Sequence, residues 1–402
     1  MVPNTSFYAA SPAQKPKSNT LLWICRMLVG ILFIFSGLIK ANDPIGFGYK
    51  LQEYFHVFQM SSLNDYSTWI AIVICALEVI LGVLLLLGIA GRKVAWGLLL
   101  LIVFFTFLTF YSSFFEVVTS CGCFGDAIPL TPWQSFSKDL ILLGLIIVIF
   151  IKRAHIKPVS KNTTVSNILT FLVVISSFAV GIYTTYYLPF IDFLPYKEGN
   201  NIPQLMEIPE GAPLDEYEHT YHLQNKTTGE SKKITDKEYM AKKIWEDELW
   251  EIVGDPETKL IKKGYQLPIP DLIISDPEGN EVTQEIIANP YYNFIVVSTD
   301  VTKLNPFDYL ALDKINQTLR EITSEENIRV VLLTSSSADD ANYLNSQLDL
   351  VLEIFYADAV PLKSMVRSNP GVLLMRNGTV IKKWSKVTFP TKDQLITTYL
   401  KR

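Results

Sequence analysis

Two cysteines separated by one glycine are the residues of this sequence best suited to covalent chemistry. Cys121 and Cys123 stand in the run Ser120-Cys-Gly-Cys-Phe-Gly-Asp126. Two thiols this close in sequence form a disulfide only if the backbone turns sharply, which the intervening Gly122 allows. Such a bridge is strained, and strain makes a disulfide easier to exchange. Three interpretations stay open: a redox-active pair, a structural bridge that fixes the loop, and thiols that bind metal or never react.

Three charged residues inside apolar segments form a second candidate site. Glu78 falls near the middle of the apolar segment 69–88, where an ionisable group is costly unless it is paired or hydrated. Lys138 and Asp139 fall about two turns into a later apolar helix, and they reach Glu78 or the cysteine loop only if these helices pack together. The three residues either fix helix packing through hydrogen bonds or handle protons or a ligand. Lys40 is expected to extend to the membrane surface instead.

Five apolar stretches in the first half of the chain are each close to the ~20 residues that cross a bilayer as a helix. They are residues 21–39, 69–88, 94–113, 134–151 and 167–188. The first is too long for the apolar core of a cleavable signal peptide, so we expect it to remain as a span. The sequence therefore predicts a multi-pass α-helical membrane protein in contact with the lipid bilayer.

The distribution of Lys and Arg predicts the orientation of these spans. Basic residues collect in the N-terminal tail and in the second-to-third and fourth-to-fifth connections, whereas the other loops carry few or balanced charges. The positive-inside rule then places the N terminus in the cytoplasm. Because the number of spans is odd, the C-terminal half is expected on the opposite side. The cysteine loop follows the third span and is expected on that side too. In a bacterial inner membrane that side is the periplasm, where disulfides persist.

The C-terminal half differs in composition from the membrane half. Residues 1–190 carry a net charge of about +5 and the remainder about −10. Residues 189–290 are rich in Pro and charge, which predicts an extended stalk. Within it we expect a small accessory subdomain, with two short strands around a turn and a helix over 236–253. The chain has no basic cluster dense enough for phosphate contacts, so a nucleic-acid partner is excluded.

From residue 291 the pattern alternates between buried-type strands and helices. Strands are expected at 293–298, 328–333, 352–356, 371–376 and 379–384, and helices at 306–323, 338–348 and 390–400. Asn377-Gly378 is a strong signal for the hairpin between the last two strands. The order of elements is typical of a thioredoxin-like domain. Active thioredoxins carry Cys-x-x-Cys at the start of the first helix. The equivalent stretch, Ser298 to Pro306, contains no cysteine, so this domain is not expected to exchange disulfides itself.

Asn369-Pro370 stands where active thioredoxins have a cis-proline that borders the peptide-binding groove. A groove retained without thiols would bind a client without reacting with it. The alternative is that the fold only supplies a rigid surface.

The motifs of the membrane half resemble those of the DoxX/MauE group of small membrane proteins. The resemblance covers residues 21–151 and rests on Ile34-Phe-Ser-Gly-Leu-Ile-Lys40, Glu78, the Ser120–Asp126 run and Lys138-Asp139. MauE-like proteins are four-helix, redox-associated membrane proteins linked with disulfide maturation of periplasmic enzymes, and they are distantly similar to vitamin K epoxide reductase. The resemblance thus implies a redox role. No Cys-x-x-Cys lies within a span, so a quinone is unsupported and no cofactor or metal is predicted.

The complete layout is similar to DoxX-family proteins of Bacteroidetes, which have a fifth span and a large exported domain. We expect a cytoplasmic tail at 1–20, a four-helix bundle at 21–151, a loop and fifth span at 152–188, a stalk at 189–290 and a thioredoxin-like domain at 291–402. Two functions remain open. One is a redox accessory protein that acts on periplasmic or envelope proteins through the cysteine loop, and the other is a non-catalytic scaffold of an envelope complex.

Overall fold

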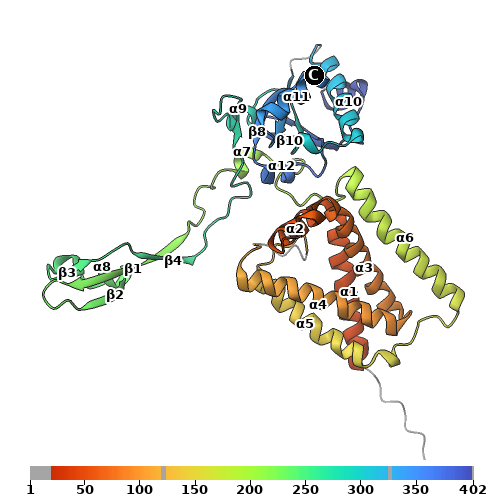
Figure 1. Cartoon of the computed structure of the whole chain (residues 1–402), viewed down its shortest axis with the longest axis horizontal. Helices are drawn as coiled ribbons and strands as arrows, with labels where there is room; N and C mark the ends of the chain where they lie inside the picture. Colours follow the sequence, from red (N-terminus) through yellow and green to blue (C-terminus); the bar gives the residue numbers. More distant parts are fainter. Residues whose placement is uncertain (1–19, 119–123, 325–327, 401–402) are drawn as a thin grey trace, which may run out of the picture. The chain divides into compact units, whose positions relative to one another are not determined.

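The computed structural model describes residues 20–118, 124–324 and 328–400 (Figure 1). The chain divides into two compact units, Met1–Phe193 and Leu194–Arg402. Each unit has its own hydrophobic core, and the two are considered separately.

The first unit is helical. Its α-helices are α1 (Thr20–Asn42), α2 (Pro44–Val57), α3 (Ser67–Leu87), α4 (Gly91–Phe115), α5 (Pro132–Ile151) and α6 (Thr163–Tyr187), with short 3-10 turns at Ser61–Tyr66 and Arg153–His155. Within the described residues, five of these helices are long and apolar enough to cross a membrane: α1, α3, α4, α5 and α6. The expectation of five spans is therefore confirmed, and the protein is a multi-pass membrane protein.

Glycines bring α1 and α3 into close contact. Gly30 and Gly82 face each other, because a Cβ on Gly82 would lie 2.8 Å from the carbonyl oxygen of Gly30. A Cβ on Gly37 would lie 2.7 Å from an α3 side chain. Small residues at such positions let membrane helices approach until their backbones almost touch. The C-terminal part of α1 is thereby held against the middle of α3, where Glu78 is located.

Helix α2 lies across the end of the bundle where α1 finishes (Figure 1). The side chain of Asp43 caps it by accepting a hydrogen bond from a backbone N–H of its first turn. Its buried face includes Phe47 and Leu51, and it packs so closely on α3 that a Cβ at Gly48 would lie 3.3 Å from the backbone of Thr68. We expected only a loop here. The spacing of its apolar residues instead makes α2 an amphipathic helix that covers the bundle end.

Helix α6 packs against α3 and is tied to the end of α1 by polar contacts. The hydroxyl of Thr184 donates a hydrogen bond to the carbonyl of Ala41 at 2.6 Å. The Asn42 side chain donates to the carbonyl of Ile191 at 2.8 Å and accepts from its N–H at 3.1 Å. The fifth span is thus attached to the other four.

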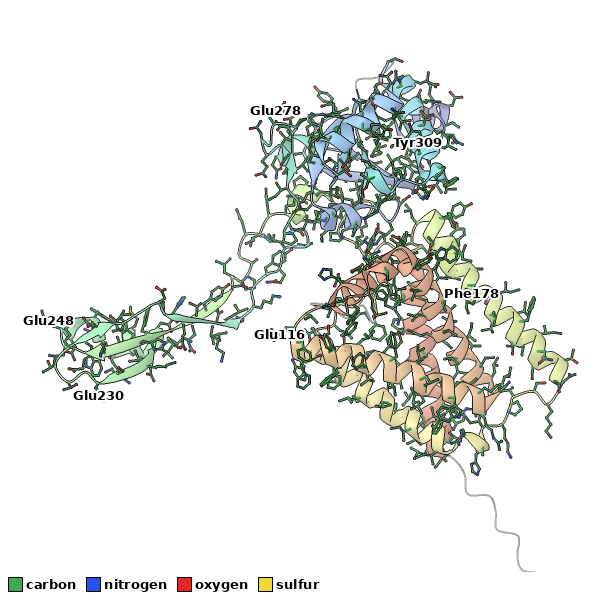
Figure 2. The ribbon with its side chains drawn as sticks, viewed as in Figure 1. Glu116, Phe178, Glu230, Glu248, Glu278 and Tyr309 are labelled. Carbon is green, nitrogen blue, oxygen red and sulfur yellow. The ribbon has the colours of Figure 1, made fainter. Side chains whose placement is uncertain are left out.

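The second unit contains a small antiparallel sheet. It is built from β1 (Glu216–Asn225), β2 (Ser231–Thr235), β3 (Trp250–Ile252) and β4 (Glu257–Lys262), with helix α8 (Asp236–Ala241) and a 3-10 turn at Ile244–Glu246. Strand β1 pairs with all three other strands. Figure 2 shows Glu230 and Glu248 exposed at one end of this sheet. The buried core is small, with Leu223 and Ile234 at its centre.

The helix expected over 236–253 is too long. Helix α8 ends at Ala241, and Lys243 takes a left-handed backbone conformation with φ of 47°. The chain turns back there, and Trp250 pairs with Asn225 of β1 as part of β3. Pairing with β1 satisfies the backbone hydrogen bonds that a longer helix would have formed internally.

The remainder of the second unit is an α/β domain. In chain order it comprises α7 (Ile202–Leu205), β5 (Ile274–Ser275), α9 (Thr283–Ile287), β6 (Asn293–Val297), a 3-10 turn at Val301–Lys303, α10 (Pro306–Thr323), β7 (Arg329–Thr334), α11 (Ala338–Leu348), β8 (Glu353–Ala357), α12 (Ala359–Met365), β9 (Gly371–Arg376), β10 (Thr379–Ser385), α13 (Lys392–Gln394) and a π-helical turn at Leu395–Tyr399. The described strands form one sheet in the order β10-β9-β6-β7-β8-β5.

The strand directions confirm a thioredoxin-like domain. Strands β6, β7 and β8 are parallel, and the β9–β10 hairpin runs antiparallel beside β6. Buried residues of β6 such as Phe294 and Val296 pack with Leu312 and Leu319 of α10 and with Trp384 of β10. The five expected strands are all present. The short elements β5, α9 and α12 were not expected, and the last helix is divided into α13 and the π-helical turn.

The first residues after the membrane unit join the α/β domain instead of forming a free stalk. The N–H of Gly199 donates to the carbonyl of Val380 at 2.8 Å, and the N–H of Val380 donates to the carbonyl of Asn200 at 3.0 Å. The N–H of Ile202 also reaches the carbonyl of Gly378 at 2.8 Å. These bonds extend the open edge of β10 and satisfy backbone groups that an extended stalk would leave to water.

Candidate functional site

Lys40 and Glu78 form a buried ion pair between α1 and α3. The Lys40 ammonium donates a hydrogen bond to Oε1 of Glu78, and both side chains are only 2% exposed. The ammonium also lies 5.2 Å from the ring centroid of Phe47 on α2 and 4.6 Å from that of Phe105 on α4. The expectation that Lys40 extends to the membrane surface is therefore wrong. The close approach of α1 and α3 offers it a carboxylate instead.

Lys138 and Asp139 form a second pair on α5. Their Nζ and Oδ1 atoms lie 2.7 Å apart, with Asp139 2% exposed and Lys138 24% exposed. The hydroxyl of Thr109 on α4 donates to the other carboxylate oxygen of Asp139 at 3.1 Å. Thr131 caps the start of α5 in a capping box with Gln134, and this start sets the depth of both charged residues.

Both pairs line one cavity of about 30 Å³. Its walls come from α1, α3, α4, α5 and the segment before α5: Leu32, Phe33, Ser36, Lys40, Glu78, Ile102, Phe105, Phe124, Lys138, Asp139 and Leu142. The structure thus brings together Glu78, Lys138 and Asp139, the three charged residues that the sequence singled out. The sequence reasoning missed the role of Lys40, although Lys40 ends the first-span motif on which the family resemblance rests.

Cys121 and Cys123 lie outside the described residues, but the residue that follows them does not. Phe124 lines the cavity, and its ring centroid lies 5.7 Å from that of Phe35 on α1. The Lys138 ammonium lies 5.2 Å from the same Phe124 ring. The described chain next to the cysteine loop therefore reaches the polar cavity. The sequence left the contact between Lys138 and this loop open, because it depends on which helices pack together.

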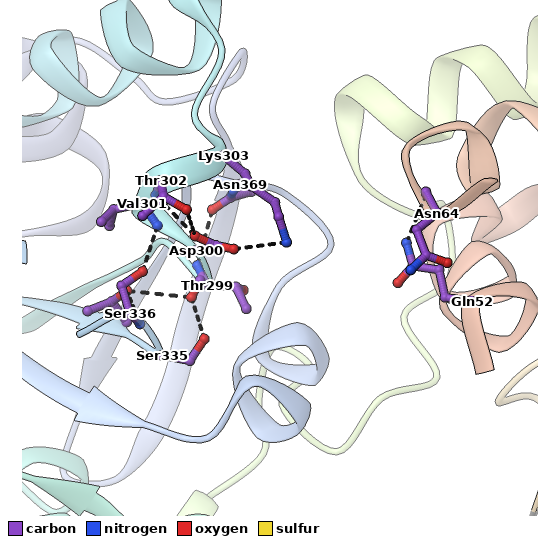
Figure 3. Close-up of polar contacts among 11 residues, drawn as sticks. Gln52, Asn64, Thr299, Asp300, Val301, Thr302, Lys303, Ser335, Ser336 and Asn369 are labelled. Atoms are coloured by element: carbon purple, nitrogen blue, oxygen red, sulfur yellow. Dashed lines mark hydrogen bonds and ion pairs between the residues drawn. The ribbon is translucent and has the colours of Figure 1, made fainter. Parts of the chain in front are cut away.

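In the α/β domain, a polar loop occupies the stretch between β6 and α10 (Figure 3). The carboxylate of Asp300 accepts hydrogen bonds from the N–H of Thr302 at 3.0 Å and from its hydroxyl at 2.6 Å, and it pairs with Lys303 at 3.0 Å. Burial alone would raise the pKa of Asp300, but the hydrogen bonds from Thr302 and the Lys303 ammonium outweigh it and hold that pKa below its usual value.

Asn369 and Pro370 lie beside this loop. The peptide bond between them is cis, and the Asn369 side-chain oxygen accepts a hydrogen bond from the N–H of Thr299 at 3.1 Å (Figure 3). The Lys386 ammonium pairs with the carboxylate of Asp308, in the first turn of α10, and donates to the carbonyl of Asn369 at 3.4 Å. Polar side chains thus connect the loop after β6 to Asn369, and they connect Asn369 through Lys386 to the first turn of α10.

Comparison with known proteins identifies the membrane half. Residues 18–152 match the family model described as methylamine utilisation protein MauE. This match covers the first four spans of the membrane region and ends before the second unit. A curated relative, protein TlpB of Flavobacterium psychrophilum, is 30% identical over 142 residues. That match covers 34% of this chain and 38% of TlpB, so the chain spans well under half the length of this relative.

Two solved structures are similar to part of the chain. Yeast Sco1 is 14% identical, with a TM-score of 0.27, and the match covers 32% of this chain and 91% of that structure. The bacterioferritin comigratory protein of Xanthomonas campestris is 12% identical, with a TM-score of 0.22, and the match covers 29% and 81%. The thioredoxin-like assignment itself rests on the strand order of the domain.

The MauE region combines groups suited to thiol chemistry. An ammonium near a cysteine favours the reactive thiolate, and Lys138 is the charged cavity residue in contact with the Phe124 ring. The carboxylates of Asp139 and Glu78 are buried in the same cavity. These groups therefore line one cavity next to the cysteine loop.

Proposed function

We propose that the protein is a redox-associated membrane accessory protein in which Cys121 and Cys123 exchange a disulfide with a client protein. In each exchange, a thiolate of one partner attacks the disulfide of the other and forms a mixed disulfide. The leaving sulfur departs as a thiolate and takes up a proton. The second thiolate of the attacking partner then attacks the mixed disulfide, closes a new disulfide and releases the other partner as a dithiol. The two electrons thus pass between pair and client, so the exchange itself needs no further oxidant.

The contact between Phe124 and the polar cavity is the observation that carries this proposal. Phe124 follows Cys123 directly, and its ring lies against Lys138 in a cavity that also contains Asp139 and Glu78. The Lys138 ammonium would favour the thiolate, and the carboxylates would handle the protons. The match of residues 18–152 to the MauE family model supports this role.

The proposal includes an orientation. The basic N-terminal tail would stay in the cytoplasm, and the cysteine loop and the thioredoxin-like domain would share the periplasm. This arrangement follows from the charge pattern of the loops. It would place the cysteine pair on the side where client disulfides form.

Trapping of mixed disulfides tests the exchange. Cys121→Ala and Cys123→Ala each leave one thiol of the pair, and at least one variant is expected to retain a covalently bound client in non-reducing gels of intact cells. The double variant should retain none. Cys25→Ala is the matched control, because Cys25 is a buried free thiol within α1. If neither single variant captures a client and the double variant behaves like the wild type, the exchange function fails.

A second candidate function is a membrane-anchored scaffold, and the α/β domain favours it. No cysteine follows Cys123 in the sequence, so the domain has no thiol of its own. Lys386 contacts both Asp308 and Asn369 and so connects the start of α10 to the Asn369-Pro370 segment. We propose that this face, with Asn369 and Pro370, recruits a client without reacting with it. The excess of negative charge over residues 191–402, about −10, suits a basic partner.

Purification of the tagged full-length protein from cross-linked native membranes tests the scaffold. A stoichiometric partner is expected, and it should stay bound to the variant that lacks both Cys121 and Cys123. A partner that disappears with the two cysteines would assign recruitment to the disulfide exchange. Recovery of no partner would argue against a scaffold.

A further inference from the structure

The cavity of the membrane region is lined both by buried charges and by an exposed side chain of a spanning helix. Leu32 lines the cavity and is 36% exposed on α1, a helix that spans the membrane. At the other extreme, the side chains of Lys40 and Glu78 are 2% exposed. Exposed side chains on a spanning helix face lipid. A molecule dissolved in the bilayer can therefore approach this cavity past Leu32 without crossing water.

Glu78 presents an unused acceptor inside the cavity. Its Oε1 accepts from Lys40, whereas its Oε2 is buried and has no hydrogen-bond partner within the part of the chain that the structure describes. Buried polar atoms are almost always hydrogen-bonded, because an unsatisfied acceptor loses its hydration without compensation. A donor from a bound molecule would satisfy Oε2.

The charges and the apolar walls define the molecule that fits. Two ammonium groups balance two carboxylates, so a charged ligand would leave a net charge in apolar surroundings. Phe33, Ile102, Phe105 and Leu142 supply apolar walls. The volume of about 30 Å³ is small, roughly the space that two water molecules need. It accommodates a polar head of a few atoms, with the rest of the molecule in lipid.

We propose that this cavity binds the hydroxyl head of a neutral, lipid-soluble alcohol. The hydroxyl donates a hydrogen bond to Oε2 of Glu78 and accepts one from the Lys138 ammonium, whose three N–H groups allow more than one partner. The apolar body leaves between α1 and α5 past Leu32. This site does not depend on the cysteine pair, so it goes beyond the proposed disulfide exchange.

Photolabelling of the full-length protein in lipid nanodiscs tests the site. The probe is azioctanol, a photoactivatable medium-chain alcohol, and adducts are located by mass spectrometry. We expect saturable labelling of the peptide that contains Glu78 and competition by unlabelled octanol. The neutral double variant Lys40→Met/Glu78→Leu removes the acceptor, and labelling of the other cavity peptides should fall by about fivefold, as expected for one lost hydrogen bond.

Two tryptophan substitutions on α1 separate the cavity from the lipid surface. Leu32→Trp narrows the entrance and should reduce labelling to the level of the lipid-facing α6 peptides. Leu28→Trp is the matched control: it lies one turn away, is 47% exposed and does not line the cavity, so labelling should persist. Two results would overturn the proposal: labelling that rises linearly with probe concentration, and labelling that is unchanged in Leu32→Trp. Either result would show that the cavity holds only water or is closed. Saturable labelling in a variant without Cys121 and Cys123 keeps the site distinct from the redox function.

Discussion

The buried pair of Lys40 and Glu78 should make the membrane bundle intolerant of losing one partner alone. Both side chains are 2% exposed, so Lys40→Met leaves a carboxylate unpaired in apolar surroundings. Methionine keeps the apolar contacts with Phe47 and Phe105 but loses the cation over their rings. Loss of one partner of a buried ion pair typically costs about 3–5 kcal/mol. We expect the free energy of unfolding of the membrane unit to fall by about this amount.

The double variant Lys40→Met/Glu78→Leu should recover most of this loss, because replacing a buried pair by apolar residues is often neutral or stabilising. Lys50→Met is the matched control. It breaks an exposed pair with Glu53 on α2, whose side chains are 26% and 43% exposed, and should cost less than about 1 kcal/mol. The assay is unfolding of the purified full chain in mixed detergent micelles, followed by tryptophan fluorescence. The reasoning is refuted if Lys40→Met costs no more than Lys50→Met, or if the double variant loses the sum of both single effects.

Three further predictions follow from the same contacts. Lys138→Met should raise by about one unit the pH at which the cysteine pair is half-maximally alkylated, because a neighbouring ammonium favours thiolate; an unchanged pH profile of alkylation would contradict the proposed role of Lys138. Asp308→Asn should destabilise the α/β domain by about 1–3 kcal/mol in urea unfolding, because it removes the charged partner of Lys386, and an effect near zero would show that this pair is not structural. Asp300 has a pKa below its unfolded value, so the stability it contributes is present above the unfolded pKa and is lost as the pH falls through the folded pKa. In acid titrations below about pH 4, the free energy of unfolding of Asp300→Asn should therefore decrease less than that of the wild type. An identical decrease in both proteins would show that Asp300 does not contribute.

The spans and the thioredoxin-like domain could be predicted from sequence because each depends on a strong local pattern. Helix α3 is an uninterrupted apolar segment of the length that a bilayer requires. Strand β6 is a short apolar run whose five residues are all buried, and it is followed by a capped helix that begins at Pro306. These patterns determine the elements and their order without information about distant contacts.

The ion pair of Lys40 could not be predicted, because it depends on which helices touch. A lysine near the end of a span can either extend to the membrane surface or pair inside the bundle. The close contact at Gly30 and Gly82 decides between these outcomes, and nothing in the sequence states that these two glycines face each other. The amphipathic spacing of Phe47 and Leu51 in α2 was a readable signal that the sequence interpretation missed.

The segment between the membrane and the α/β domain was also difficult to predict, for a different reason. Its Pro-rich, charged composition is typical of an extended chain, yet Gly199 and Ile202 form backbone hydrogen bonds with the β9–β10 hairpin. Edge pairing of this kind depends on backbone groups, which leave no trace in hydrophobic patterning. The long helix predicted after residue 236 failed similarly, because β3 completes a sheet with β1.

The oxidation state of Cys121 and Cys123 in intact cells tests the central claim most directly. Thiols are alkylated in place with a mass-shifting maleimide before and after reduction, in the wild type and in Lys138→Met. We predict a pair that is partly reduced at steady state, with a reduced fraction that changes in the Lys138 variant. A pair that is always fully oxidised and insensitive to Lys138 would identify a structural bridge and contradict disulfide exchange.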